Sequence, residues 1–147
     1  MADLVNLTID GQSLQVPKGT LLVDAARKLG IEIPVYCYHP KLEPMGACRV
    51  CAVELPGQRR PIVTACTTEV AEGMTVLTRS PGAVKAREGI LEFLLINHPL
   101  DCPVCDRGGE CDLQDFTVRY GPGKSRFVEE RRHFIQRNAK DVRFLDI

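Results

Sequence analysis

The chain has 147 residues, of which 44% are hydrophobic and 26% charged, which suits one compact domain or two small ones with a modest core. Its 19 Lys and Arg residues balance 19 Asp and Glu residues, so the overall charge does not point to nucleic acid or an anionic membrane as a partner. No apolar run approaches the roughly 18 residues of a membrane helix, and the N-terminus has neither a signal-peptide nor a transit-peptide pattern. We therefore expect a soluble protein, in the compartment where it is made, without direct membrane insertion.

The chain begins with a predicted β-hairpin. Residues 4–9 alternate between apolar and polar side chains and predict a strand, and residues 13–16 predict the returning strand. Asp10-Gly11 between them is a typical hairpin turn signal.

A helix and several short strands are expected next. Thr20 is expected to cap a helix that runs to Leu29 and stops at Gly30. Three prolines and a glycine make residues 34–49 an irregular loop. Short strands are expected near residues 50–55, 61–66 and 74–78. This order indicates an α+β fold, compatible with a small ferredoxin-like sheet that grips one helix.

The second half of the chain is predicted to be mainly helical. Ser80 is an N-cap followed by a proline at the first helical position, and the helix should end near Asn97. Its apolar side chains are expected to pack against the N-terminal half. They are Val84, Ile90, Leu91, Leu94 and Leu95. A compact loop over residues 98–111 and a second helix over about 110–120, closing at Gly121, follow.

The charge is unevenly distributed. Residues 1–118 carry 11 Lys or Arg against 15 Asp or Glu, whereas residues 119–147 carry 8 against 4. A basic tail behind an acidic body is either a solvated segment or a docking surface for another subunit.

The seven cysteines are the most informative residues. An odd number without a secretory signal argues against a disulfide framework, and a reducing cytosol keeps thiols free as metal ligands. They form a first group of four and a second group of three. These are Cys37, Cys48, Cys51 and Cys66, followed by Cys102, Cys105 and Cys111.

The spacing of the four cysteines in the first group is typical of metal ligands. Ten, two and fourteen residues separate its members, and the two-residue spacer lets Cys48 and Cys51 reach one inorganic centre. Plant-type 2Fe–2S ferredoxins also combine loop ligands with one distant cysteine, although their first gap is four residues. The alternative is a structural zinc site with four cysteines, but zinc ribbons normally show two Cys-x-x-Cys pairs and this half has one.

The second group needs one more ligand. Its three cysteines fall within ten residues and can cap one face of a cubane cluster. His98, four residues upstream, is a competent iron ligand and completes the set. His39 lies beside Cys37 and could compete, but the first site already has four thiolates. A zinc site with three cysteines and one histidine is the alternative.

Three motifs make the chain recognisable: GACRVC at residues 46–51, NHPLDCPVC at 97–105 and GGECDLQD at 108–115. They closely resemble the large, G-type iron–sulfur subunit of bacterial respiratory complex I, NADH:quinone oxidoreductase. The resemblance covers about residues 1–125.

The resemblance implies two clusters and three regions. It places a 2Fe–2S cluster on Cys37, Cys48, Cys51 and Cys66, and a 4Fe–4S cluster on His98, Cys102, Cys105 and Cys111. Residues 1–79 would form a 2Fe–2S ferredoxin-like (β-grasp) domain and residues 80–121 a small helical 4Fe–4S domain. Residues 122–147 would be the basic tail, leading to a missing or absent downstream region.

The resemblance also implies the role of the chain. It would be an electron-relay subunit that passes electrons from an FMN-containing, NADH-oxidising flavoprotein subunit towards quinone, with the NADH site on that other chain. It would lie with other peripheral-arm subunits on the cytoplasmic side of the bacterial inner membrane. The family's large subunit continues beyond this length with more cysteines, so the chain is either a fragment or a shortened homologue. The diaphorase subunit of an NAD-reducing hydrogenase or formate dehydrogenase is the alternative.

Overall fold

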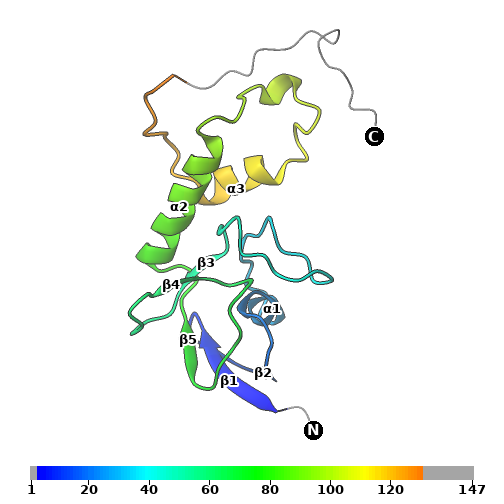
Figure 1. Cartoon of the computed structure of the whole chain (residues 1–147), viewed down its shortest axis with the longest axis vertical. Helices are drawn as coiled ribbons and strands as arrows, with labels where there is room; N and C mark the ends of the chain where they lie inside the picture. The colour runs from blue at the N-terminus through cyan, green and yellow to red at the C-terminus, as the bar shows by residue number, and fades with distance from the viewer. Residues whose placement is uncertain (1–2, 131–147) are drawn as a thin grey trace.

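The computed structural model describes residues 3–130. In Figure 1 the β-sheet and helix α1 (Leu22–Lys28) lie at one end of an elongated molecule, and helix α2 (Pro81–Leu95) runs away from them. The loop after α2 and helix α3 (Asp112–Tyr120) form the other end. Within residues 3–130, no helix is both long and apolar enough to cross a membrane.

The predicted hairpin is confirmed and supplies two strands of a three-stranded sheet with the order β2-β1-β5, in which β1 is central. Strand β1 (Leu4–Ile9) pairs antiparallel with β2 (Gln12–Pro17) and parallel with β5 (Met74–Val76). Asp10 and Gly11 both have positive φ angles, 47° and 83°, as a type I′ hairpin turn requires.

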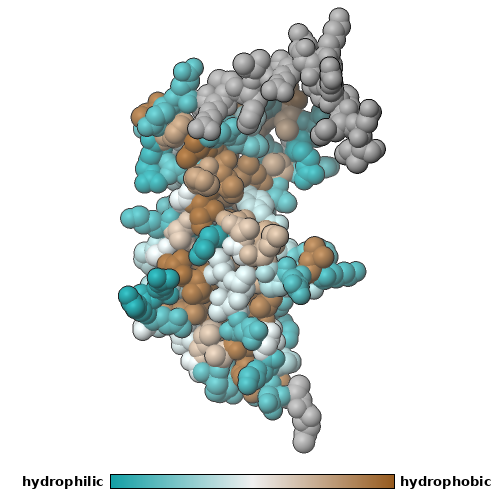
Figure 2. Space-filling view, viewed as in Figure 1, coloured by the Kyte–Doolittle hydropathy of each residue, from teal (hydrophilic) through white to brown (hydrophobic). Residues whose placement is uncertain are grey.

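The core lies between this sheet and α1. The buried side of α1 consists of Leu22, Val23, Ala25 and Ala26. Each fully buried Val, Leu or Ile side chain contributes about 1.5–3 kcal/mol. The side chains packed with α1 in this cluster include Val5, Leu7, Ile9, Val16, Val53 and Val76. The chain is therefore α+β, as its sequence predicts. The space-filling view in Figure 2 shows apolar side chains continuing along the face that joins the two ends of the molecule.

Thr20 does not cap α1, so that prediction is wrong. The residue before the helix is Leu21, in an extended conformation, and it makes no side-chain cap hydrogen bond. The Thr20 hydroxyl instead donates to the carbonyl of Pro17 at 2.6 Å and closes the preceding turn.

The first N–H groups of α1 are satisfied by a distant segment. The amides of Leu22 and Val23 donate to the carbonyls of Thr68 and Ala65, at 2.9 and 3.1 Å. These two carbonyls flank Cys66 in the sequence, so the start of α1 fixes the segment that carries this cysteine.

Strands β3 (Ala52–Glu54) and β4 (Ile62–Thr64) form a separate antiparallel pair. Backbone hydrogen bonds of 2.9 and 2.8 Å between Glu54 and Leu77 tie this pair to the chain that follows β5. The small β3–β4 hairpin is thereby held against the rest of the N-terminal half.

Helix α2 begins where the sequence predicts. The Ser80 hydroxyl accepts a hydrogen bond from the Ala83 amide at 3.1 Å, and a proline occupies the first helical position.

The packed side of α2 differs from the prediction. The buried side chains are Ala83, Arg87 and Leu91, which are spaced by four residues along one face. Val84 and Leu94 were expected to pack but are 40% and 38% exposed. Leu91 is buried as expected, so the apolar pattern identified only part of the inward face, which also contains an arginine.

The basic tail over residues 122–147 is described only as far as residue 130, so Arg131, Arg132 and Arg137 lie outside the described residues. In the described part, the Arg126 side chain forms an ion pair with Glu92 of α2, and its amide donates to the same carboxylate at 2.7 Å. This part of the tail contacts the chain's own helix.

Candidate metal centres

The β3–β4 hairpin positions two of the four cysteines in the first group. Cys51 directly precedes β3, and Cys66 follows β4 by two residues. Because Ala52 pairs with Thr64, both cysteines lie at the same end of the hairpin. The Ala65 amide donates to the Cys51 carbonyl at 3.0 Å and holds this end together.

The other two cysteines come from the irregular loop that follows α1. The Cys48 amide donates to the Cys37 sulfur at 3.4 Å. Burial acts to raise the pKa of Cys37, but hydrogen bonds from the backbone at Cys48 and Ala47 outweigh it and lower that pKa overall. The backbone therefore favours the thiolate at Cys37, which is the form that binds metal.

The four thiols of the first group act on one another. The pKa of Cys66 rises to about 12, first because the thiol is buried and then because of its hydrogen bond with Cys51. The negative charges of Cys51, Cys37 and Cys48 raise it further. The four cysteines thus lie close enough to interact electrostatically, with Cys51 and Cys66 buried and the other two half-buried. Metal binding would remove the protons that this mutual repulsion retains.

Two tight backbone features shape the loop around Cys48. Gly46 has a φ angle of +63°, and a Cβ atom there would lie 2.8 Å from the Thr67 Cγ2 atom. Arg49 has a φ angle of 60°, which is uncommon for a residue with a side chain and occurs often at functional sites. The loop therefore reverses sharply between Cys48 and Cys51.

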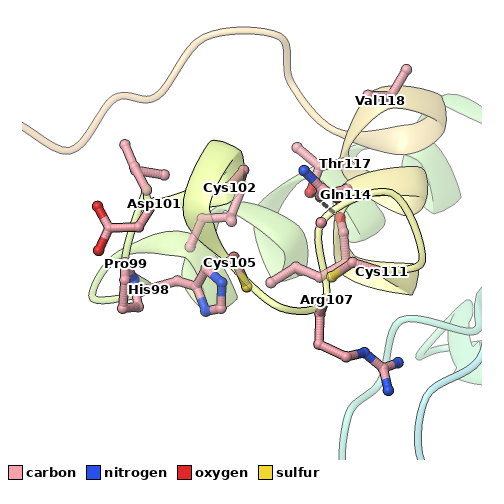
Figure 3. A pocket seen from close by; sticks show the side chains of 14 residues that line it. His98, Pro99, Asp101, Cys102, Cys105, Arg107, Cys111, Gln114, Thr117 and Val118 are labelled. Carbon is pink, nitrogen blue, oxygen red and sulfur yellow. Dashed lines mark hydrogen bonds between the residues drawn. The ribbon is translucent and has the colours of Figure 1, made fainter.

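All four predicted ligands of the second site line one cavity of about 350 Å³. His98 follows the end of α2, and the cysteines occupy a short 3₁₀ turn (Cys102–Val104), the residue after it and the N-cap of α3. In Figure 3 the His98 ring points towards Cys105, whereas the Arg107 guanidinium extends away from both. The other lining residues are largely apolar and include Leu95, Leu100, Leu113 and Val118.

Close backbone contacts at Gly108 hold the loop over residues 98–111 together. A Cβ atom at Gly108 would lie 2.7 Å from the Cys102 carbonyl oxygen and 3.0 Å from that of Cys105. The Gly108 amide donates to the Cys105 carbonyl at 2.8 Å, and the Gln114 side chain accepts from the Gly109 amide at 3.2 Å. Gln114 was not predicted as a site residue, and its one signal in the sequence is its place in the third motif.

The two groups of ligands meet at Tyr36, another residue that the sequence did not reveal. It precedes Cys37, its hydroxyl donates to the Asp112 carbonyl at 3.3 Å, and its ring centroid lies 5.0 Å from that of Phe116. Its pKa rises to about 12 through burial, followed by the charges of Asp112, Cys111 and Cys48. Tyr36 therefore lies between ligand residues of both sites.

The two cysteine groups suit iron–sulfur clusters by their donors and surroundings. Soft thiolates with at most one imidazole are the usual ligands of such clusters. Within residues 3–130, no three His, Cys, Asp or Glu side chains are arranged to hold a single metal ion. His39 lies in the loop that carries Cys37, where its ring nitrogen accepts a hydrogen bond from the Lys41 amide at 3.2 Å.

Comparison with protein families gives two matches. Residues 2–81 match the model described as "2Fe-2S iron-sulfur cluster binding domain". Residues 87–126 match the "NADH-ubiquinone oxidoreductase-G iron-sulfur binding region". The first model spans more than half of the chain, and each match contains one group of cysteines.

Curated relatives agree with these matches. The chain is 56% identical over 134 residues to the G subunit of NADH-quinone oxidoreductase from Streptomyces coelicolor, covering 90% of this chain and 16% of that protein. It is 49% identical over 135 residues to the NADH-ubiquinone oxidoreductase 75 kDa subunit of Reclinomonas americana, covering 92% of this chain and 19% of the relative. The chain thus spans less than one fifth of the length of these relatives.

A solved structure shares the fold. A chain from the crystal structure of an NAD+-reducing [NiFe]-hydrogenase in the H2-reduced state superposes with a TM-score of 0.71 at 30% identity. The match covers 87% of this chain and 55% of the hydrogenase chain.

Proposed function

We propose that this chain relays electrons between two iron–sulfur clusters. Over residues 2–81 it belongs to the family of 2Fe-2S iron–sulfur cluster binding domains. It corresponds to the N-terminal part of the G subunit of NADH-quinone oxidoreductase. The observation that carries the proposal is the cavity that gathers His98, Cys102, Cys105 and Cys111, inside the segment that matches the oxidoreductase-G iron–sulfur binding region.

The first four cysteines would hold a 2Fe–2S cluster, and the cavity ligands a 4Fe–4S cluster. Each cluster supplies one-electron chemistry when bound. The chain's own residues would fix the two positions, keep water away with apolar side chains and protect the buried Cys51 and Cys66. Electron tunnelling falls steeply with distance, so the rigid placement of both sites is the main contribution of the protein.

The proposed partners follow from the same assignment. Electrons would arrive from an FMN-containing, NADH-oxidising flavoprotein subunit and leave towards quinone through other peripheral-arm subunits of complex I. The location would be the cytoplasmic side of the bacterial inner membrane. We place the domain boundaries at residues 79 and 121, between the two cluster-binding regions and before the basic tail.

A second candidate is the diaphorase subunit of an NAD-reducing hydrogenase, which the 0.71 TM-score favours. Sequence identity argues for the first candidate, because it is 56% to the Streptomyces coelicolor relative but 30% to the hydrogenase chain.

The test is anaerobic reconstitution followed by iron and acid-labile sulfide analysis and low-temperature EPR of the reduced protein. We expect two distinct signals in the wild type, loss of the 2Fe–2S signal in Cys48→Ala and loss or conversion of the 4Fe–4S signal in His98→Ala. His39→Ala is the matched control and should keep both. A colourless protein with stoichiometric zinc would refute the proposal, and a normal 4Fe–4S signal at full iron content in His98→Ala would refute that ligand.

A further inference from the structure

Arg87 is a charged side chain in the interior of the protein. It lies on the inward face of α2 and is only 4% exposed. Its Nε and Nη2 atoms donate to the Ala52 carbonyl at 3.1 and 2.9 Å, and Nη2 also donates to the Thr78 carbonyl at 2.6 Å. These carbonyls satisfy hydrogen bonds but do not neutralise a positive charge.

Within residues 3–130, Arg87 forms no ion pair with a carboxylate, although Glu32 and Glu88 line the same cavity. Its guanidinium carbon lies 5.7 Å from the centroid of the Tyr120 ring. Asp10 acts on it electrostatically, but both oxygens of that carboxylate accept hydrogen bonds from Thr78. Arg79 adds a repulsive positive charge. Burying a cation without an ion-pair partner is energetically unfavourable.

Another group that acts on Arg87 belongs to the first metal centre. Ala52, which accepts two of the hydrogen bonds, directly follows Cys51, and Cys51 is among the groups that act on Arg87. Cys51 is fully buried, so water screens this interaction weakly. A cluster held by four thiolates is anionic and gains one more negative charge when it is reduced.

We propose that Arg87 is the buried counter-charge of the 2Fe–2S site and that it raises the reduction potential of the cluster. The inference rests on the proposed function, because it needs a cluster on the first four cysteines. Arg87 is a positioning and electrostatic residue and not a ligand. Its charge stabilises the reduced cluster more than the oxidised one, since attraction grows with the added electron.

The experiment is an EPR-monitored redox titration of the cluster-loaded protein in Arg87→Gln, Arg87→Met and Arg87→Lys. Both neutral variants should make reduction of the 2Fe–2S cluster about tenfold or more less favourable, which for one electron is about 59 mV lower. Arg87→Lys should stay near the wild-type potential because it keeps the charge. Arg79→Gln is the matched control, since it removes an exposed arginine near the same site, and it should change the potential little. The 4Fe–4S signal of each sample serves as an internal reference.

The outcomes separate the two proposals. Iron and sulfide content of the wild type tests the cluster itself, independently of Arg87. A full complement of iron with an unchanged 2Fe–2S potential in Arg87→Gln or Arg87→Met would overturn the inference. If neither neutral variant takes up the cluster, Arg87→Lys decides: a wild-type potential supports the inference, and a drop despite the retained charge overturns it.

Discussion

Replacing Gly46 by alanine would test how tightly the first-site loop packs. The φ angle of +63° imposes strain on any residue with a Cβ atom, at about 1–2 kcal/mol. The new Cβ would also lie 2.8 Å from the Thr67 Cγ2 atom, and relieving an overpacked contact of this kind costs about 1–3 kcal/mol. Together the two effects predict a destabilisation of about 2–5 kcal/mol.

Two further variants separate strain from the clash. Gly57→Ala shares the left-handed backbone, with a φ angle of +80°, but has nothing within 4 Å of its Cβ, so it should lose only about 1–2 kcal/mol. Thr67→Ser removes the clashing methyl group but keeps the hydroxyl, which hydrogen-bonds to Thr64. The double variant Gly46→Ala/Thr67→Ser should therefore regain the stability lost to the clash but not the stability lost to backbone strain.

The assay is thermal unfolding of the cluster-loaded protein under anaerobic conditions, followed by visible circular dichroism, with iron retention measured in parallel. A change of 1 kcal/mol shifts the melting temperature of a domain of this size by roughly 4 °C. The melting temperatures should rank Gly57→Ala and the double variant together, above Gly46→Ala. The reasoning fails if Gly46→Ala is no less stable than Gly57→Ala, or if Thr67→Ser brings no recovery.

Three other predictions use different probes. Gly108→Ala should lower the iron content of the second site, because its Cβ would press on two ligand-residue carbonyls, whereas Gly89→Ala in α2 meets nothing and should keep both clusters. In the metal-free protein, iodoacetamide at pH 8 should modify Cys37 before Cys66, because the pKa of Cys37 is lowered whereas that of Cys66 is raised to about 12. Equal modification rates by mass spectrometry would contradict this. Burial, and then a hydrogen bond to a carboxylate, raise the pKa of Tyr38 from 10.0 to about 12. The folded state therefore holds the Tyr38 hydroxyl proton more tightly than the unfolded state. The contribution of Tyr38 to the free energy of unfolding is complete below pH 10 and is lost between pH 10 and 12, by at most about 1.4 kcal/mol per pH unit. Tyr38→Phe should flatten that loss in urea titrations.

The sequence predicted features whose signal is local. The hairpin at Asp10, the cap at Ser80 and the three motifs each lie within a few residues, and the structure has the hairpin and the cap in place. Thr20 also had a local signal, but its hydroxyl bonds to Pro17 because the chain turns there. A local signal fails where a neighbouring contact competes for the same group.

Features that depend on distant packing were not predictable. Arg87 is buried because the carbonyls of Ala52 and Thr78 converge on it from two other segments, and no periodicity in α2 reveals this. Tyr36 joins the two ligand groups through Phe116, eighty positions away in the chain. Such contacts follow from the tertiary fold and leave no short-range trace.

The parallel pairing of β1 with β5 has a consequence for the kinetics of folding. Its partners, such as Leu7 and Met74, are far apart in sequence, and closing so long an excursion is entropically unfavourable and slow. All four cysteines of the first group lie inside that excursion. Ligation by one cluster would divide it into shorter loops, as a cross-link does. Cofactor insertion should then accelerate completion of the sheet, and the chain without iron should reach its native strand order more slowly.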